Sequence, residues 1–338
     1  MNLSCLAFDP DLAPGARNAV ETCLRLEPRE RVTLISDFEA REIAAALVHE
    51  IERVGAPYRA FVLEELAERP LRDGMPEEVL ADLAQSQVSI YAASAGPGEL
   101  KARIQMTDVV NRHRLRHGHM VGITKQIMRE GMRADFAEVD ALSERLIARA
   151  RAAREIRVTS PAGTDLVATF SPQLKWIKTS GLITTAKWGN LPGGEIFTAP
   201  LTVDGRFVVD GVVGDYLGPK YGDIGSTPLT VDMVDGRITA LDCPNAELLA
   251  EFRAYTSTDE NSHRVGEFAL GTNTAVRDVC GNILQDEKIP GMHMAFGHPY
   301  AQHTGADWAS TTHIDCVGRR FDIWMNGEPV MRDGVYLV

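Results

Sequence analysis

The stretch RVTLISDFEAREIAAALVHEIERVGAPYRAFVLE, residues 31–64, predicts a strand, a helix and a second strand in succession. Residues 31–37 form a short β-rich apolar run, which is typical of a buried strand. Residues 39–56 repeat apolar side chains at helical intervals and carry a glycine near their end. Residues 58–64 predict another strand. This order indicates a βαβ unit, in which a helix connects two parallel strands.

The same alternation continues along the first part of the chain. Residues 76–85 predict a helix and residues 88–94 a strand. We therefore expect an α/β N-terminal domain over residues 1–138, with a parallel sheet covered by helices.

The pattern of predicted elements changes after a long polar helix, which the sequence predicts within residues 135–154. We place the helix that connects the two domains at residues 139–155. From residue 156 short strands are interrupted by glycine and proline, with one helix expected at 245–256 and another after Gly271. The expected second domain, residues 156–338, is β-rich and of the α+β class.

Length and charge limit the possible classes of function. A chain of 338 residues exceeds what one hydrophobic core usually supports, so two domains are the natural expectation. The net charge of −12 and a pI near 5.3 would repel phosphate backbones and anionic lipid. We expect neither nucleic acid nor membrane as a partner.

The cysteines favour a reducing compartment. They are odd in number and scattered, and no two form a Cys-x-x-Cys pair: Cys5, Cys23, Cys243, Cys280 and Cys316. No basic segment followed by an apolar run opens the sequence, and no apolar stretch approaches the ~20 residues that cross a bilayer. We expect a cytoplasmic protein.

Several catalytic motifs fail on inspection. VHEIER, residues 48–53, begins like the zinc-protease helix motif, but Arg53 stands where the second histidine is required. Neither a glycine-rich nucleotide-binding pattern nor a Gly-x-Ser-x-Gly nucleophile elbow is present. RHRLRHGHM, residues 112–120, holds His113, His117 and His119 without a carboxylate. We expect it to be a solvated turn, or an arm reaching a neighbouring active site.

Ionisable residues interrupt apolar runs in the second half. Glu195 follows a Pro-Gly-Gly turn in NLPGGEIFTAP, residues 190–200. Glu267 lies in VGEFALGTN, residues 265–273, and His293 lies among methionines in GMHMAFGHPY, residues 291–300. Each of them taken singly has a structural explanation.

The run THIDCVG, residues 312–318, adds His313 and Asp315, which share one face of a strand because side chains alternate. A paired core histidine is one interpretation of this pair, and two metal ligands are the other. Two glutamates, two histidines and an aspartate are many ionisable groups to bury, and a divalent cation would neutralise them. Oxygen and nitrogen donors without sulfur suit zinc, cobalt, manganese or iron(II).

Four segments, NLPGGEIFTAP, VGEFALGTN, HMAFGHPY and THIDCVG, follow a helix leading into IRVTSPAGTDL. In this order they resemble the aminopeptidase T and aminopeptidase S family of metallopeptidases, often called leucyl aminopeptidases. The likeness covers roughly residues 120–338, and the first hundred residues only in general texture. The chain is shorter than typical members, and the stretch between Tyr300 and His313 looks trimmed, which leaves substrate size open.

The resemblance implies a pair of divalent ions in the second domain, and it implies a homodimer. For the ions we expect zinc, cobalt or manganese. The implied ligands are Glu195, Glu267, His293, His313 and Asp315, with Tyr300 as an assisting hydroxyl. We therefore expect a metal-dependent hydrolase that cleaves the N-terminal amide bond of small peptides or related amides with a two-metal activated water. Glu195 or Glu267 would serve as general base, and the sequence does not separate them.

Two other functions remain open. The related dihydroxypyridine ring-opening dioxygenases share the fold and the terminal His-x-Asp but bind a single iron(II), and they lack a glutamate matching Glu195. A non-catalytic binding protein on an inherited enzyme fold is the third hypothesis, although such proteins tend to lose ligands and all five candidates are present. Metal content separates the three functions.

Overall fold

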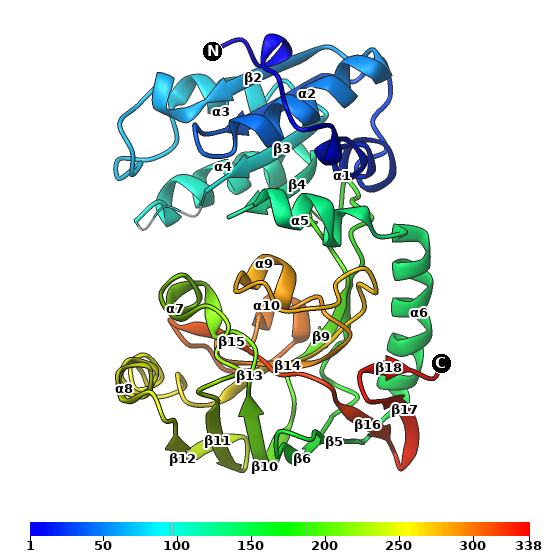
Figure 1. Ribbon diagram of the computed structural model, residues 1–338, viewed down its shortest axis with the longest axis vertical. Helices are drawn as coiled ribbons and strands as arrows, with labels where there is room; N and C mark the ends of the chain where they lie inside the picture. The colour runs from blue at the N-terminus through cyan, green and yellow to red at the C-terminus, as the bar shows by residue number, and fades with distance from the viewer. Residues whose placement is uncertain (95, 97, 187) are drawn as a thin grey trace. The chain divides into compact units, whose positions relative to one another are not determined.

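The computed structural model describes residues 1–94, 96, 98–186 and 188–338, and they form two compact units (Figure 1). The first unit comprises Met1–Phe136 and Gly181–Gly193, and the second comprises Ala137–Ser180 and Gly194–Val338. The domain limits expected from the sequence stay a prediction. No helix among the described residues is both long enough and apolar enough to span a membrane.

The first unit contains a parallel sheet with the strand order β2-β1-β3-β4-β8. Its strands are β1 (Val32–Ser36), β2 (Tyr58–Val62), β3 (Val88–Ala93), β4 (Arg116–Val121) and β8 (Gly189–Asn190). Its helices are α1 (Ala13–Arg17), α2 (Arg41–Val54), α3 (Glu77–Leu83), α4 (Leu100–His113) and α5 (Lys125–Arg129). Helix α1 packs on α2, and α3 packs on α4. The expected helix-covered parallel sheet is confirmed.

Helix α2 illustrates why the first unit folds as its sequence predicts. Ile43, Leu47 and Ile51 recur every four residues on one buried face of this helix. The helix ends at Gly55, whose φ of 80° is a left-handed conformation that glycine adopts without the strain other residues incur. The next strand can therefore begin at Tyr58.

The interpretation of residues 112–120 as a solvated turn was wrong. His113 ends α4, whereas His117 and His119 lie on β4 between β3 and β8 and are buried. The Ser89 hydroxyl is 2.8 Å from His117 Nδ1, and His117 Nε2 is 3.1 Å from His119 Nδ1. The His119 ring stacks on Tyr91. The basic composition of the segment suggested solvent, but neutral imidazoles bonded to each other can be buried.

The second unit consists mainly of two antiparallel sheets. One has the order β12-β11-β10-β6-β5-β16-β17-β18 and the other β15-β14-β13-β9-β7. The strands of the first are β5 (Glu155–Thr159), β6 (Asp165–Thr169), β10 (Thr202–Val209), β11 (Leu229–Val234), β12 (Arg237–Asp242), β16 (Asp322–Met325), β17 (Glu328–Arg332) and β18 (Val335–Tyr336). Those of the second are β7 (Ile177–Thr179), β9 (Glu195–Thr198), β13 (Val265–Gly271), β14 (Gly291–Gly297) and β15 (His313–Val317). The expected β-rich architecture is confirmed.

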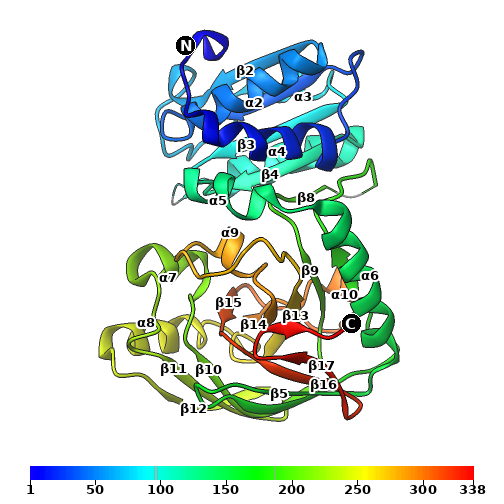
Figure 2. The same ribbon diagram turned by 45° about the vertical axis from the view of Figure 1, so that its right-hand side comes forward.

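Five helices accompany these sheets among the described residues of the second unit. They are α6 (Phe136–Ala152), α7 (Gly214–Tyr221), α8 (Ala246–Tyr255), α9 (Ile283–Asp286) and α10 (Ala301–Thr304). The expected helices at 245–256 and after Gly271 correspond to α8 and to the single turn α9. Figure 2 shows the long α6 lying beside the two sheets.

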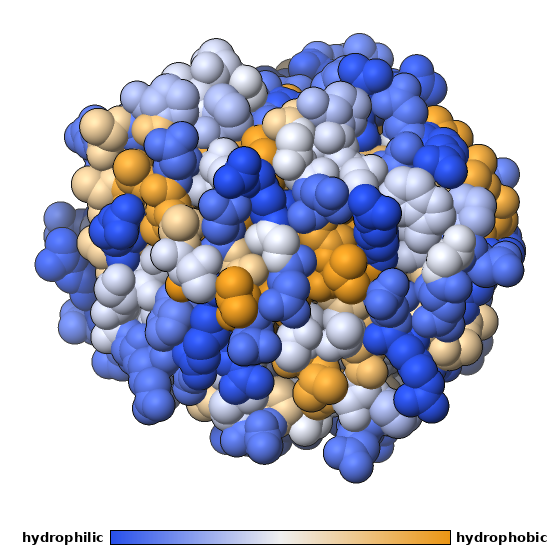
Figure 3. Space-filling view, turned by 90° about the horizontal axis from the view of Figure 1, so that it is seen from below, coloured by the Kyte–Doolittle hydropathy of each residue, from blue (hydrophilic) through white to orange (hydrophobic). Residues whose placement is uncertain are grey.

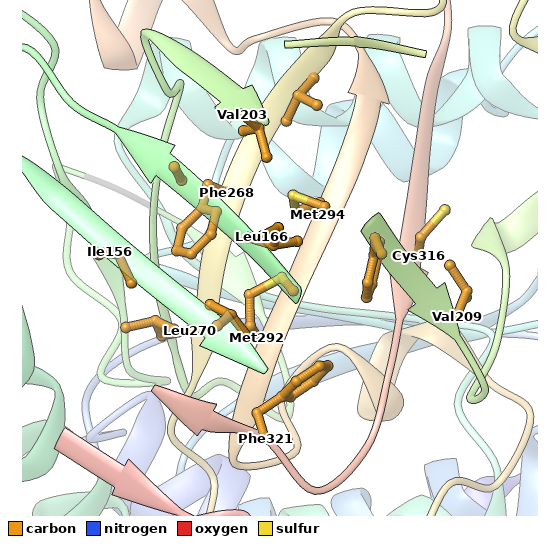
Figure 4. Close-up of a cluster of buried hydrophobic side chains, with 14 of the residues drawn as sticks. Ile156, Leu166, Val203, Val209, Phe268, Leu270, Met292, Met294, Cys316 and Phe321 are labelled. Atoms are coloured by element: carbon orange, nitrogen blue, oxygen red, sulfur yellow. The ribbon is translucent and has the colours of Figure 1, made fainter. Parts of the chain in front are cut away.

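The hydrophobic core of the second unit includes one face of the five-stranded sheet. Phe268, Leu270, Met292 and Met294 point into it and meet side chains of the larger sheet, such as Leu166 (Figure 4). Seen from below, the molecule carries small separate apolar patches among hydrophilic residues (Figure 3). Because side chains alternate along a strand, the residues between these core positions occupy the other face of the sheet.

Candidate metal centre

The five sequence-predicted ligands lie on that other face of the five-stranded sheet. Glu267 and Asp315 are both registered with Ala295, which lies on the strand between them. His293 is registered with Ala269, two residues from Glu267, and Glu195 is registered with Gly271, four residues from Glu267. His313 is two residues from Asp315. Even spacings and direct partners share a face, so all five side chains project from one side.

Three of these residues form the first group. Glu195, Glu267 and His293 each offer one donor atom, and these atoms lie within 4.8 Å of one another. His293 Nε2 is 3.4 Å from Glu195 Oε2 and 3.8 Å from Glu267 Oε1. All three residues are buried.

The second group shares Glu267 with the first. Its members are Glu267, His313 and Asp315, again with donor atoms within 4.8 Å. His313 Nε2 is 3.4 Å from Asp315 Oδ1 and 3.8 Å from Glu267 Oε2. The two oxygens of Glu267 therefore face different histidines, so this carboxylate can bridge two positions.

Sequence reasoning missed a fourth carboxylate and a lysine. Glu287 forms a further donor group with His293 and Asp315. The buried Lys288 pairs with both Glu195 and Glu287. Both residues follow α9, where an adjacent glutamate and lysine look like an ordinary solvated pair. No local pattern in QDEKIPG, residues 285–291, marks Lys288 as buried or Glu287 as part of a site.

Glycines allow the chain segments to approach each other here. A Cβ atom at Gly271 would lie 2.0 Å from the carbonyl oxygen of Ile289, so the segment carrying Lys288 can rest on β13 only over a glycine. At Gly194, with a φ of 132°, a Cβ atom would lie 2.7 Å from the Asn273 side chain. These close approaches place Glu195 and Lys288 side by side.

Charge pairing sets the protonation of both histidines. Burial disfavours the charged form of His293, but Glu195 and Glu267 outweigh burial and raise its pKa to about 10. Burial likewise opposes the charged form of His313, and Asp315 and Glu267 raise its pKa to about 10. The imidazolium rings thus occupy the place of cations between carboxylates, and a metal would have to displace their protons.

The carboxylates differ from one another. Burial acts to raise the pKa of Glu195, but Lys288 and His293 outweigh it and hold this pKa below the ordinary value. Burial raises the pKa of Glu267. Burial also raises the pKa of Glu287, to about 8, against the opposing effect of Lys288. Glu267 and Glu287 are therefore better suited than Glu195 to carry a proton near neutral pH.

Tyr300 lies against the second group. Its ring centroid is 4.8 Å from that of His313 and 5.8 Å from that of Phe197. Its φ of 49° and ψ of 50° are left-handed, a strained conformation for an aromatic residue, and such strain is common at functional sites. The Tyr300 N–H donates to His298 Nδ1. Burial raises the pKa of Tyr300 well above its ordinary value, so the phenol keeps its proton.

Backbone contacts orient the His313 ring. Its Nδ1 atom lies 2.9 Å from the carbonyl oxygen of His298, an acceptor, so Nδ1 carries a hydrogen and Nε2 faces the carboxylates. The Tyr255 hydroxyl donates to the His313 carbonyl oxygen at 3.1 Å. A histidine held in this way presents one defined nitrogen to a ligand.

The donor set fits a divalent metal. Four carboxylates, those of Glu195, Glu267, Glu287 and Asp315, meet two histidines and one lysine on this face. The buried Nε2 atom of His293 has no hydrogen-bond partner among the described residues. A buried nitrogen that has no hydrogen-bond partner and faces carboxylates on two strands is well placed to be a metal ligand.

The fold of this chain is similar to the folds of two solved structures. The chain is similar to wild-type AmpT from Thermus thermophilus, with 19% identity, a TM-score of 0.72 and coverage of 98% of this chain and 100% of that one. It is also similar to a 2,5-dihydroxypyridine dioxygenase from Pseudomonas putida KT2440, with 16% identity, a TM-score of 0.69 and coverage of 97% of both chains. At these identities the likeness concerns the fold.

The search of curated protein sequences returned no match. The family described as thermophilic metalloprotease (M29) matches residues 136–319, which include the whole donor cluster and more than half of the chain. The expected resemblance to this group of metallopeptidases is confirmed, and the chain belongs to the M29 family of thermophilic metalloproteases.

Proposed function

We propose that this protein is a metal-dependent aminopeptidase that hydrolyses the N-terminal amide bond of small peptides or related amides. The observation that carries the proposal is Glu267, whose two oxygens face His293 and His313 respectively, so that one carboxylate joins two donor groups. Glu195 and His293 complete one group, and His313 and Asp315 complete the other.

Bound divalent ions would supply a Lewis acid for the scissile carbonyl and lower the pKa of a water molecule. The residues of the chain supply the rest of the chemistry. Tyr300 keeps its proton and can donate a hydrogen bond to an oxyanion. Glu287, with a pKa near neutrality, is the group best suited to take a proton from water and pass it to the leaving amine. The expected general-base role of Glu195 or Glu267 stays a prediction.

The proposal is tested by elemental analysis of the purified protein combined with assays on amino-acid amides, dipeptides and N-acetylated dipeptides. We expect zinc, cobalt or manganese at two ions per chain and hydrolysis only of substrates with a free N-terminus. Equal turnover of the N-acetylated peptides would contradict an aminopeptidase, and absence of bound metal would contradict the site.

A second candidate is a mononuclear iron(II) ring-opening dioxygenase. It is favoured by one observation, the similarity of the fold to a dihydroxypyridine dioxygenase at nearly the same TM-score as to AmpT. Glu267, His313 and Asp315 alone form a group that could hold one ion. One iron per chain with oxygen consumption on a dihydroxypyridine, without amide hydrolysis, would favour this function.

A homodimer and a cytoplasmic location remain part of the proposal, together with a small peptide or amide as the substrate. Size-exclusion chromatography with light scattering measures the oligomeric state directly. A monomer at working concentration would contradict the homodimer without affecting the proposed chemistry.

A further inference from the structure

Lys288 is a fixed positive charge inside the donor cluster. The residue is 1% exposed, and its Nζ atom is 2.6 Å from Glu195 Oε1 and is also paired with Glu287. Its carbonyl oxygen accepts a hydrogen bond from the Asn273 N–H at 3.0 Å, and its backbone rests on Gly271. The ammonium group is thus paired with two carboxyl groups, and the backbone of Lys288 is held by a hydrogen bond and by its packing on Gly271.

Lys288 limits how Glu195 can bind a cation. Glu195 Oε1 accepts hydrogen bonds from Lys288 Nζ and from the Thr179 hydroxyl, the latter at 2.8 Å. Oε2 faces His293 Nε2 instead. Glu195 therefore offers one oxygen to a metal, and part of its negative charge is already compensated.

The two donor groups consequently differ in charge. In the first group, Lys288 stands beside one of the two carboxylates. In the second group, the ion-pair partners of Glu267 and Asp315 among the described residues are histidines. Both histidines are themselves candidate ligands, whereas Lys288 is an ammonium group fixed between Glu195 and Glu287. A divalent ion in the first group would therefore lie beside the positive charge of Lys288, which pairs with Glu195. An ion in the second group would have no ligand paired with this lysine.

We propose that Lys288 makes the two metal positions unequal, so that the position at Glu195, Glu267 and His293 binds its ion more weakly than the position at Glu267, His313 and Asp315. This inference rests on the proposed two-ion hydrolase. One ion then stays bound and the other exchanges with solution, so that hydrolysis follows the concentration of free divalent metal. Lys288 is a positioning residue that acts through Glu195 and needs no contact with substrate.

The test is a metal titration of the chelator-treated full chain with Co²⁺, followed by visible absorption and by competition with a chromophoric chelator. We expect two binding steps in the wild type. Lys288→Met should tighten the weaker step by at least about tenfold, because a like charge near the ion is removed. It should leave the tighter step nearly unchanged. Lys220→Met is the matched control, since Lys220 also pairs with two glutamates, Glu247 and Glu251, but at the surface.

Two further variants assign the steps. Glu195→Gln should remove the weaker step, and the additional change Lys288→Met should then have no effect on the remaining one. Asp315→Asn should instead remove the tighter step. If Lys288→Met does not fold, Lys288→Gln keeps a hydrogen-bond donor to Glu195 without the charge and carries the same expectation.

Several outcomes would overturn the inference. These are two equal steps in the wild type, a single ion in both proteins, or a weaker step that Lys288→Met loosens or leaves unchanged. Failure of the proposed function is a separate result, namely absence of any bound metal, or absence of amide hydrolysis when both positions are filled.

Discussion

Glu267 on β13 and Asp315 on β15 lie in one register row, because Ala295 of β14 is paired with both of them. Two carboxylates in one row of a sheet, with a single small alanine between them, would repel each other without cations. His293 and His313 lie within 4 Å of these carboxylates. This row therefore defines the centre of the candidate site.

His313→Ala should abolish hydrolysis while the fold stays intact. The ring contributes a metal donor on an edge strand of its sheet and is not needed to fill the core. We expect loss of metal from the Glu267, His313 and Asp315 group and a circular dichroism spectrum like that of the wild type. His303→Ala, at an exposed histidine of α10, is the control. Near wild-type turnover with metal still bound would refute the assignment of His313.

Glu195→Gln separates the two enzymatic functions. The amide keeps the size of the side chain but removes the charge that would hold an ion beside His293. In a two-ion hydrolase, metal content should fall from two towards one and turnover should fall by ~10² or more. In a mononuclear iron enzyme, iron and ring opening should change little. Metal per chain and both activities are measured on this variant and on the exposed control Glu328→Gln.

Tyr300→Phe should lower kcat by about 10- to 100-fold with little change in metal content. The change removes only the hydroxyl, and the ring can keep its contacts with Phe197 and His313. Steady-state kinetics and elemental analysis are the measurements, with Tyr221→Phe as the control. An unchanged kcat would show that the Tyr300 hydroxyl does not assist the reaction.

Glu287→Gln should remove the proton carrier proposed for hydrolysis. We expect kcat to fall by ~10² to 10⁴ and the acidic limb of the pH–rate profile to change, since the pKa of this carboxyl is about 8. The control is Glu287→Asp, which keeps an acid and should retain more activity. Equal loss in both variants, with metal also lost, would instead indicate a ligand role.

The first unit should lose stability in acid because of its buried histidines. Burial lowers the pKa of His119 to about 3 and that of His117 well below its ordinary value. Between about pH 6.5 and pH 3 the unfolded chain therefore binds more protons than the folded one, so stability is full above this window and falls as the pH falls. From pH 7 to pH 5 the loss for one such histidine is about 2 kcal/mol.

Urea unfolding at pH 7 and pH 5 measures this loss. His119→Phe keeps an aromatic ring beside Tyr91 without a titrating nitrogen, and its stability should depend less on pH than that of the wild type. His113→Gln, at an exposed histidine, should leave the pH dependence unchanged.

A triple alanine variant of His113, His117 and His119 should keep its metal stoichiometry, and loss of metal there would show a role for these rings in the site.

The sequence alone predicted the features that depend on local periodicity. The strand, helix and strand of residues 31–64 follow from the spacing of apolar residues, since a side chain's face is set by its own backbone period. The same rule placed His313 and Asp315 on one face of a strand. Charged residues inside apolar runs also identified Glu195, Glu267 and His293 as unusual, and the resemblance to metallopeptidases added Tyr300.

Only the tertiary structure decided which segments meet. The registers that align Glu195, Glu267, His293 and Asp315 on one face join strands far apart in the chain, and no local pattern encodes such pairing. Burial of His117 and His119 depends on neighbouring strands and on Trp188, which follows about seventy residues later. In the sequence, Lys288 resembles one partner of a surface ion pair. In the structure, Gly271 allows the backbone of Lys288 to pack on β13, and the ammonium group lies against Glu195. Burial and ion pairing depend on residues far apart in the chain, so only the tertiary structure shows that Lys288 is part of the candidate site.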